Sequence, residues 1–172
     1  YGDLDKLPGN SIVIDAGLNL GLFSLHIART WHGHGALTIM AFEPAREAYD
    51  LAVQNLQNNG VTVISHGACL SGMHEHDLLV AGKDSLVVVH CFMMALSSSS
   101  GQEDFCYFPY LTSSSTLARH RKAKDVARSS GCFDRRLVHF FFSSEQKEVV
   151  TCTTLAEAFA AADSQSSALK GQ

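Results

Sequence analysis

The chain has 172 residues, of which 46% are apolar, and a mean hydropathy of +0.05. This length and composition fit one globular domain with a sizeable core and exclude a disordered chain. The net charge of −4 gives no electrostatic reason to expect a nucleic acid partner. We also expect no membrane association, because no apolar run reaches the roughly 18 residues that a spanning helix needs.

Five cysteines are scattered along the chain, and none belongs to a CxxC pair. This pattern indicates neither a zinc site nor a redox motif. Free thiols are typical of reducing compartments, so the sequence predicts an intracellular, cytoplasmic or organellar protein.

The first strand–turn–helix unit is predicted near the start of the chain. Residues 11–16 (SIVIDA) form a β-branched apolar run, typical of a strand buried on both faces of a parallel sheet. Gly17 and Gly21 bracket the turn that follows. A helical apolar pattern begins at Leu22 and ends before Gly33. The apolar residues fall on two adjoining stripes of this helix, one with Leu22 and Leu25 and the other with Phe23, Ile27 and Trp31.

A second strand–helix unit follows. Residues 37–42 (LTIMAF) predict another buried strand, which Glu43-Pro44 closes. Pro44 suits the first position of a helix, where its missing N–H costs nothing. We expect this helix to turn Tyr49, Val53 and Leu56 inward and to stop at Asn59-Gly60 in a left-handed turn.

Two segments compete for the third strand, namely residues 61–64 and the more apolar run 86–96 (LVVVHCFMMAL). The residues alone leave both candidates open. The HEHD run at 74–77 lies between them, and adjacent ligands on a short stretch rarely complete a tetrahedral site, so no metal is predicted. His90 and Cys91 are expected to be packed core residues.

The alternation of strands and helices predicts an α/β, Rossmann-like fold with strands one to three parallel and in the order 3-2-1. Antiparallel additions are expected from 103 to 152. They include an edge strand at 105–110, because Pro109 cannot donate to a ladder. The remaining expected elements are strands at 137–142 and 148–152 and helices at 118–128 and 155–162.

The turn at 15–21 (DAGLNLG) carries the most specific chemistry. A dinucleotide-binding turn would read GxGxxG, with a second glycine that lets the backbone approach a pyrophosphate. Asn19 stands at that second glycine position and Leu22 at the third. Asp15 would repel a pyrophosphate, whereas a carboxylate there favours a ligand with an ammonium group, such as the methionine end of S-adenosylmethionine.

Glu43 lies 22 residues after Gly21, at the carboxyl end of the neighbouring strand. Ligands bind outside this end of the strands in open α/β sheets. A carboxylate there can accept both ribose hydroxyls, and each hydrogen bond to a charged group contributes about 1.5–3 kcal/mol. The alternative is a plain strand–helix–strand unit with packing glycines and an exposed Glu43.

These residues resemble a known family. VIDAGLNLGLFSLHIAR (13–29) is similar to the first motif of FkbM-type methyltransferases, which is close to V-D-x-G-A-N-x-G-x-F-S. AFEP (41–44) with NLQNNGV (55–61) resembles the family's second strand and helix. Residues 93–117 and TCTTLAEAF (151–159) resemble later segments, so the resemblance covers most of the chain. Both ISHGACLS (64–71) and VVHCFMMALSS (88–98) are similar to the same family segment, which implies that 86–92 is the third strand and that 65–84 is an insertion loop.

The resemblance implies a class I methyltransferase fold and S-adenosylmethionine as methyl donor. It also implies O-methylation of a hydroxyl on a small-molecule, sugar, peptide-type or polyketide-type substrate. The cofactor-binding residues implied by position are Asp15, Gly17, Leu18, Asn19, Gly21, Glu43 and Pro44. No catalytic base is assigned, although His120 and His139 are candidates.

The family continues past the position that matches Gln172 into further strands. We therefore expect residues 1–172 to be the N-terminal half of one methyltransferase-like domain, with an incomplete sheet that favours association with another chain. Two other functions stay open. One is a non-catalytic remnant or interaction module, and the other is an NAD-binding or nucleotide-sugar-binding enzyme.

Overall fold

The computed structural model describes residues 7–8, 10–31, 35–70, 87–108, 115, 117 and 143–168. Its chain divides into two compact units, Tyr1–Ser100 with Thr151–Gln172, and Gly101–Val150. The elements expected at 118–128 and 137–142, the HEHD run, and both candidate bases lie outside the described residues.

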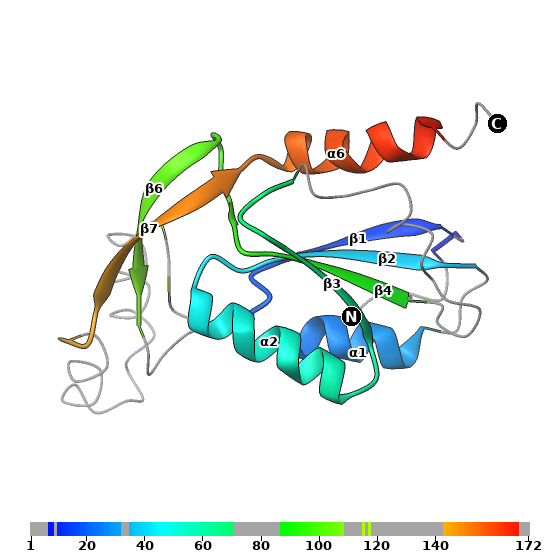
Figure 1. Ribbon diagram of the computed structural model, residues 1–172, viewed down its shortest axis with the longest axis horizontal. Helices are drawn as coiled ribbons and strands as arrows, with labels where there is room; N and C mark the ends of the chain where they lie inside the picture. Colours follow the sequence, from blue (N-terminus) through cyan, green and yellow to red (C-terminus); the bar gives the residue numbers. More distant parts are fainter. Residues whose placement is uncertain are drawn as a thin grey trace, which may run out of the picture. The chain divides into compact units, whose positions relative to one another are not determined.

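A four-stranded parallel sheet forms the centre of the first unit (Figure 1). Its strands, in spatial order, are β1 (Ser11–Ala16), β2 (Leu37–Phe42), β4 (Val87–Phe92) and β3 (Thr62–Gly67). Every neighbouring pair is parallel. The α/β class predicted from the alternation of strands and helices is therefore confirmed.

Both candidates for the third strand are strands of this sheet. β4 pairs with β2 along its whole length, as predicted for 86–92, and gives the expected 3-2-1 order. β3 pairs with the other side of β4 and adds an outer strand. The expectation of an insertion loop from residue 65 is wrong for 65–67, because Ser65 and Gly67 extend the ladder opposite Cys91 and Phe92.

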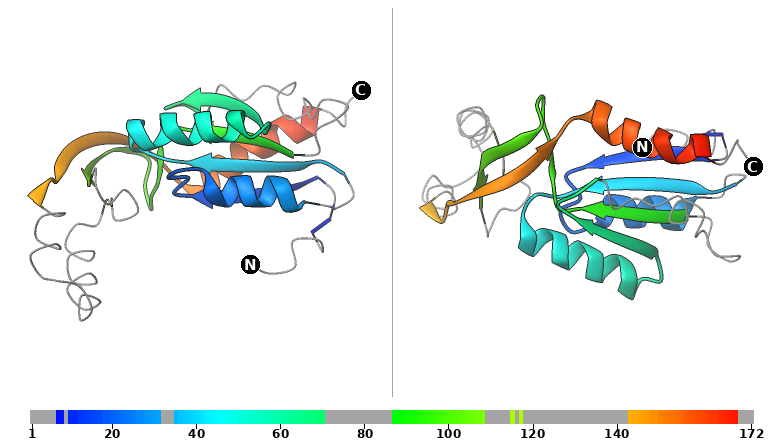
Figure 2. Two further views of the ribbon diagram at one scale, coloured as in Figure 1. Left: turned by 90° about the horizontal axis from the view of Figure 1, so that it is seen from below. Right: turned by 45° about the horizontal axis from the view of Figure 1, so that its top comes forward.

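Two helices cover one face of the sheet. α1 (Leu22–Thr30) and α2 (Arg46–Asn58) lie side by side on that face in both views of Figure 2. Alternate strand residues point toward them, because successive side chains of a strand face opposite sides. The buried cluster comprises Leu18, Ile27, Trp31, Leu37, Ile39, Ala41, Tyr49, Ala52, Leu56, Val87, Val89 and Cys91.

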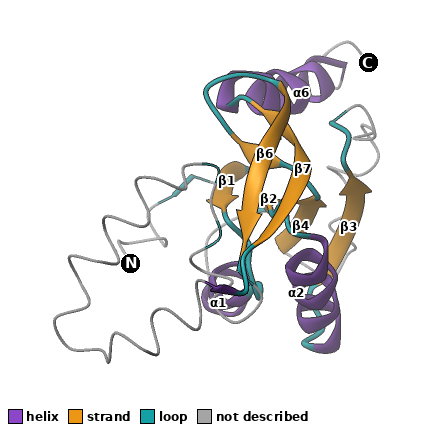
Figure 3. Ribbon diagram, turned by 90° about the vertical axis from the view of Figure 1, so that its left-hand side faces the viewer, coloured by secondary structure: helices purple, strands orange, loops and turns teal. Residues whose placement is uncertain are grey.

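The other face of the sheet is covered by α6 (Leu155–Ala168), as Figure 3 shows. Ala158 and Ala162 of this helix pack with Phe42 and Phe92, whose rings stack with their centroids 4.9 Å apart. The small alanine side chains allow close approach of the helix to the sheet. The helix predicted at 155–162 is therefore confirmed and continues further.

α6 begins with a reciprocal capping arrangement. The backbone N–H of Glu157 donates to the Thr154 hydroxyl at 3.2 Å, and the N–H of Thr154 donates to Glu157 Oε2 at 3.2 Å. These bonds satisfy N–H groups that have no partner within the helix. The sequence Thr-x-x-Glu thus fixes where the helix starts.

The first helix starts at Leu22, as predicted, whereas the second starts later than predicted. Leu22, on the apolar stripe of this helix, is 64% exposed, whereas Ile27 is fully buried. α2 begins at Arg46 with Ala45 as N-cap, so Pro44 precedes the helix. Its stop at Gly60, with φ of 74°, is as predicted.

His90 is a core residue, as expected. Its side chain is fully buried, and its Nδ1 lies 2.9 Å from Nε2 of His66 on β3. The two imidazole rings stack at a centroid distance of 5.2 Å. This contact joins the outer strand to β4.

A second, three-stranded sheet has the order β5-β7-β6. Its strands are β5 (Ala95–Leu96), β6 (Gly101–Tyr107) and β7 (Gln146–Thr153). β6 and β7 run in opposite directions in Figure 1, as the expected antiparallel portion requires, whereas β5 is parallel to β7. β7 confirms the strand predicted at 148–152.

Candidate active site

The two predicted acidic residues lie on the same side of the sheet. Asp15 is in register with Ala41, which is in register with Cys91. Glu43 follows the last residue of β2, and its N–H donates to Phe92 O at 3.0 Å, which continues the ladder. Since side chains alternate along a strand, Asp15, Glu43 and Cys91 all face α1 and α2.

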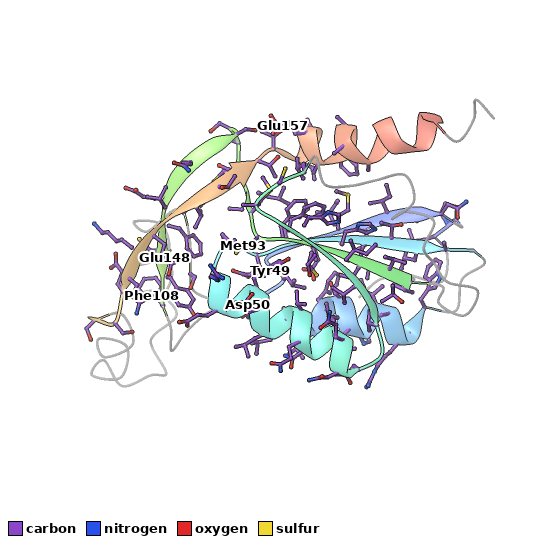
Figure 4. The ribbon with its side chains drawn as sticks, in the orientation of Figure 1. Tyr49, Asp50, Met93, Phe108, Glu148 and Glu157 are labelled. Carbon is purple, nitrogen blue, oxygen red and sulfur yellow. The ribbon has the colours of Figure 1, made fainter. Side chains whose placement is uncertain are left out.

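This shared location is the carboxyl edge of the sheet. Figure 4 labels Met93, directly after β4, and Tyr49 of α2 beside that edge. Ligands of open α/β sheets bind at this edge. The arrangement excludes the alternative in which Glu43 is merely exposed, because its side chain is only 7% exposed.

The turn after β1 is fixed by backbone hydrogen bonds. The N–H groups of Gly17 and Leu18 both donate to Phe42 O at 2.9 Å, and Gly21 N–H donates to Leu18 O at 2.7 Å. Gly17 and Gly21 have φ of 98° and 76°, which lie in the left-handed region that glycine adopts without strain. Asn19 also has a positive φ, 49°.

Glu43 holds this turn in place. Its Oε2 accepts a hydrogen bond from Asn19 N–H at 2.9 Å, and its Oε1 accepts one from Ala45 N–H at 3.0 Å. Each carboxylate oxygen has two lone pairs and so can accept a further hydrogen bond. Glu43 can therefore orient the turn and still bind hydroxyl donors.

Asp15 has its own partner on α1. Ser24 Oγ donates to Asp15 Oδ2 at 2.6 Å, and the Ser24 side chain is fully buried. The family motif that 13–29 resembles ends in this serine, but the sequence did not indicate that it binds Asp15. Only the path of the turn brings the first turn of α1 over the end of β1.

Burial dominates the electrostatics of both carboxyl groups. Desolvation raises the pKa of Asp15, and the hydrogen bonds from Ser24 oppose this effect. Desolvation also raises the pKa of Glu43, and the negative charge of Asp15 adds to the rise. A cation bound near them would favour the ionised form of both groups.

The two turn glycines have different surroundings. A Cβ on Gly21 would lie 3.3 Å from Ala52 O and from Leu56 Cγ, so this glycine allows α1 and α2 to pack closely. A Cβ on Gly17 would meet no atom within 4 Å, so its surface is open. Leu18 is buried in the apolar cluster, which leaves only its backbone at the turn, and Pro44 is half-buried.

Two further residues belong to this edge and were not predicted as part of the site. Tyr49 is buried, and its hydroxyl donates to Cys91 O at 3.2 Å. Burial, with the charge of Asp15, raises the pKa of Cys91 to about 12. Cys91 is therefore a neutral thiol at physiological pH and is no nucleophile.

Over the part of the chain that the structure describes, no group of three or more His, Cys, Asp or Glu residues could hold a metal ion. Among the helices of that same part, none combines the length and apolar character required to cross a bilayer.

Comparison with known proteins identifies relatives. The chain is 34% identical over 122 residues to methyltransferase sdnD of Sordaria araneosa, a match that covers 71% of this chain and 37% of that protein. This chain is a relative of methyltransferases. It is also 30% identical over 76 residues to methyltransferase 1 of Beauveria bassiana strain ARSEF 2860, a match that covers 44% of this chain and 29% of that protein.

The chain thus spans little more than a third of the length of methyltransferase sdnD and less than a third of the length of methyltransferase 1. No family model matches the chain, and no solved structure matches it.

Proposed function

We propose that this chain forms the cofactor-binding part of an S-adenosylmethionine-dependent methyltransferase of the FkbM type. The observation that carries the proposal is the pair of buried carboxylates, Asp15 and Glu43, on one side of the carboxyl edge of a parallel sheet. Similarity to two proteins named methyltransferase supports the reaction class.

The chemistry of the residues fits this cofactor better than a dinucleotide. Residues 10–28 contain no Lys or Arg that could neutralise a phosphate, and the turn is flanked by two acids. S-adenosylmethionine carries an ammonium and a sulfonium, so its charges complement the carboxylates. The open surface above Gly17 leaves room for close approach of a nucleoside to the backbone.

Each proposed contact follows from a residue's position. Glu43 would accept the ribose hydroxyls through its free lone pairs, and Asp15 would face the ammonium group. Gly17, Leu18, Asn19 and Gly21 would line the ligand with their backbone, while Pro44 would direct the chain away from Glu43. The bound cofactor supplies an electrophilic methyl group for transfer.

We further propose O-methylation of a hydroxyl on a small-molecule, sugar, peptide-type or polyketide-type acceptor, as in the family that the turn resembles. Methyl transfer to a hydroxyl needs in-line approach of the oxygen and a base that removes its proton. The residues placed at the carboxyl edge serve the cofactor, so we assign the base and the acceptor pocket to no described residue.

Binding of S-adenosylhomocysteine, measured by isothermal titration calorimetry, tests the proposal. We expect saturable binding that Glu43→Gln weakens at least tenfold, because an amide nitrogen would replace one accepting oxygen. Glu47→Gln, a change of the same kind on the exposed side of α2, is the matched control and should bind normally. Far-UV circular dichroism checks that both variants are folded.

Two results would overturn this function. Binding of NAD in preference to S-adenosylhomocysteine would indicate a dinucleotide enzyme. No binding of either ligand at millimolar concentration would indicate a non-catalytic module.

A further inference from the structure

We propose that Ser24 is a positioning residue for the ligand, holding the Asp15 carboxylate ionised and aimed at the ammonium group. This inference rests on the proposed function, because it explains why Asp15 would be negatively charged at the proposed ligand site. The observation that carries it is the 2.6 Å hydrogen bond from Ser24 Oγ to Asp15 Oδ2.

The hydrogen bond is short and buried. Ser24 is 0% exposed and Asp15 is 6% exposed, so little water competes for this bond. A hydroxyl that donates to an ionised carboxylate forms a stronger and shorter bond than one between neutral groups. A buried hydroxyl would be costly without such a partner.

The N-terminus of α1 also favours a negative charge on Asp15. Gly21 is the N-cap and gives no side-chain hydrogen bond, and the first turn of α1 contains no acidic residue. Helix N-termini have unsatisfied N–H groups and a partial positive charge. Asp15 comes from β1 to meet this terminus, and the backbone N–H of Ser24 also lowers its pKa.

Within the described part of the chain, the other groups beside Asp15 oppose its ionisation or are neutral. Glu43, after β2, is a like charge, and the two carboxylates raise each other's cost of ionisation. Cys91, on β4, is a neutral thiol. Tyr49, on α2, is a neutral phenol whose hydroxyl donates to Cys91 O. Among the described residues, Ser24 is therefore the side chain that favours the charged form of Asp15.

A purely structural serine and a positioning serine differ in two measurable ways. If Ser24 acts through Asp15, its removal shifts the pH dependence of ligand binding toward higher pH. It also affects only ligands that carry the ammonium group. A loss of packing would instead weaken every ligand equally and leave the pH dependence unchanged.

The test compares S-adenosylhomocysteine with 5′-methylthioadenosine, which lacks the amino acid portion, across about pH 5 to 9 by calorimetry. For Ser24→Ala we expect about tenfold weaker binding of S-adenosylhomocysteine at neutral pH, with recovery as the pH rises, and unchanged binding of 5′-methylthioadenosine. Thr30→Ala is the matched control, since Thr30 also carries a hydroxyl on α1 but donates to His26 O.

A double-mutant cycle adds a second measurement. Asp15→Asn should weaken S-adenosylhomocysteine binding. Adding Ser24→Ala to this variant should weaken binding little further, because both changes remove the same interaction. Full additivity, or a Ser24→Ala profile that matches the unaltered chain at every pH, would overturn the inference. If the unaltered chain bound neither ligand, the proposed function itself would fail instead.

Discussion

The backbone N–H of Asn19 donates a hydrogen bond to Glu43 Oε2 at 2.9 Å, which joins the turn after β1 to the residue that follows β2. The other carboxylate oxygen accepts from Ala45 N–H, just before α2. One side chain thus links two loops that are separate in sequence. This linkage makes the shape of the turn depend on an acid that also faces the proposed ligand site.

The close packing of Gly21 predicts a large effect of an added methyl group. Gly21→Ala meets both a left-handed φ of 76° and contacts at 3.3 Å with Ala52 O and Leu56 Cγ. Gly60→Ala meets a similar φ of 74° but open space. We expect Gly60→Ala to cost about 1–2 kcal/mol of unfolding free energy, and Gly21→Ala to cost a further 1–3 kcal/mol or so from overpacking.

Urea unfolding followed by circular dichroism measures both glycine variants. Equal losses of unfolding free energy in the two variants would show that the contacts of residue 21 with α2 do not contribute to the loss. The comparison separates backbone strain from packing, because the two glycines have nearly the same φ.

The raised pKa values of Asp15 and Glu43 predict how stability depends on pH. An acid with a folded pKa above its unfolded pKa binds protons more readily when folded. Its stabilising contribution is complete below the unfolded pKa, near the ordinary values of 3.8 and 4.5, and is lost as pH rises through the folded pKa. Ionised and buried carboxylates therefore lower stability at neutral pH.

Asp15→Asn tests this direction, because the amide stays neutral and its oxygen can still accept from Ser24. We expect the variant to melt at a higher temperature than the unaltered chain at about pH 7, with a difference that shrinks as the pH falls toward about 4. Differential scanning fluorimetry without ligand is sufficient. A difference in melting temperature that grew at acidic pH would contradict a raised pKa of Asp15.

The cysteines should differ in reactivity. Cys91 is fully buried with its pKa raised to about 12, whereas Cys69 is exposed. Since the thiolate is the reactive form, we expect a maleimide at about pH 8 to modify Cys69 rapidly and Cys91 only at the rate of unfolding. Peptide mapping by mass spectrometry gives the order of labelling. Early modification of Cys91 would show that this edge opens in the native state.

The position of β1 predicts self-association of the chain. β1 is the terminal strand of the sheet, and its side chains Ile12, Val13 and Ile14 are only half-buried. Apolar edge strands with unpaired N–H and C=O groups pair readily with another chain. We propose a second copy of this chain as the partner when it is studied alone.

Sedimentation velocity over a range of concentrations checks this association. We expect a concentration-dependent dimer, together with slower hydrogen exchange of β1 amides at high concentration, while β4 amides stay unchanged. A chain that sedimented as a monomer throughout, with constant β1 exchange, would rule the pairing out.

The sequence alone determined the inner architecture. Continuous β-branched and apolar runs at 11–16, 37–42 and 86–92 predicted parallel strands, and the two inner strands, β2 and β4, are buried on both faces, whereas β1 at the edge is half-buried. Gly17, Gly21 and Gly60 marked the turns because a positive φ costs glycine nothing. Asp15 and Glu43 were identifiable because strand ends of a parallel sheet share one edge.

Tertiary structure decided the rest, because it depends on contacts between segments distant in the chain. The sequence allowed a strand at 61–64, but its extension through 65–67 depends on pairing with β4, since its own pattern stops being apolar at Ser65. The role of Ser24 depends on where α1 begins relative to β1. Whether Asp15 and Glu43 lie exposed or buried together is set by the helices packed over them, and a linear pattern does not specify that packing.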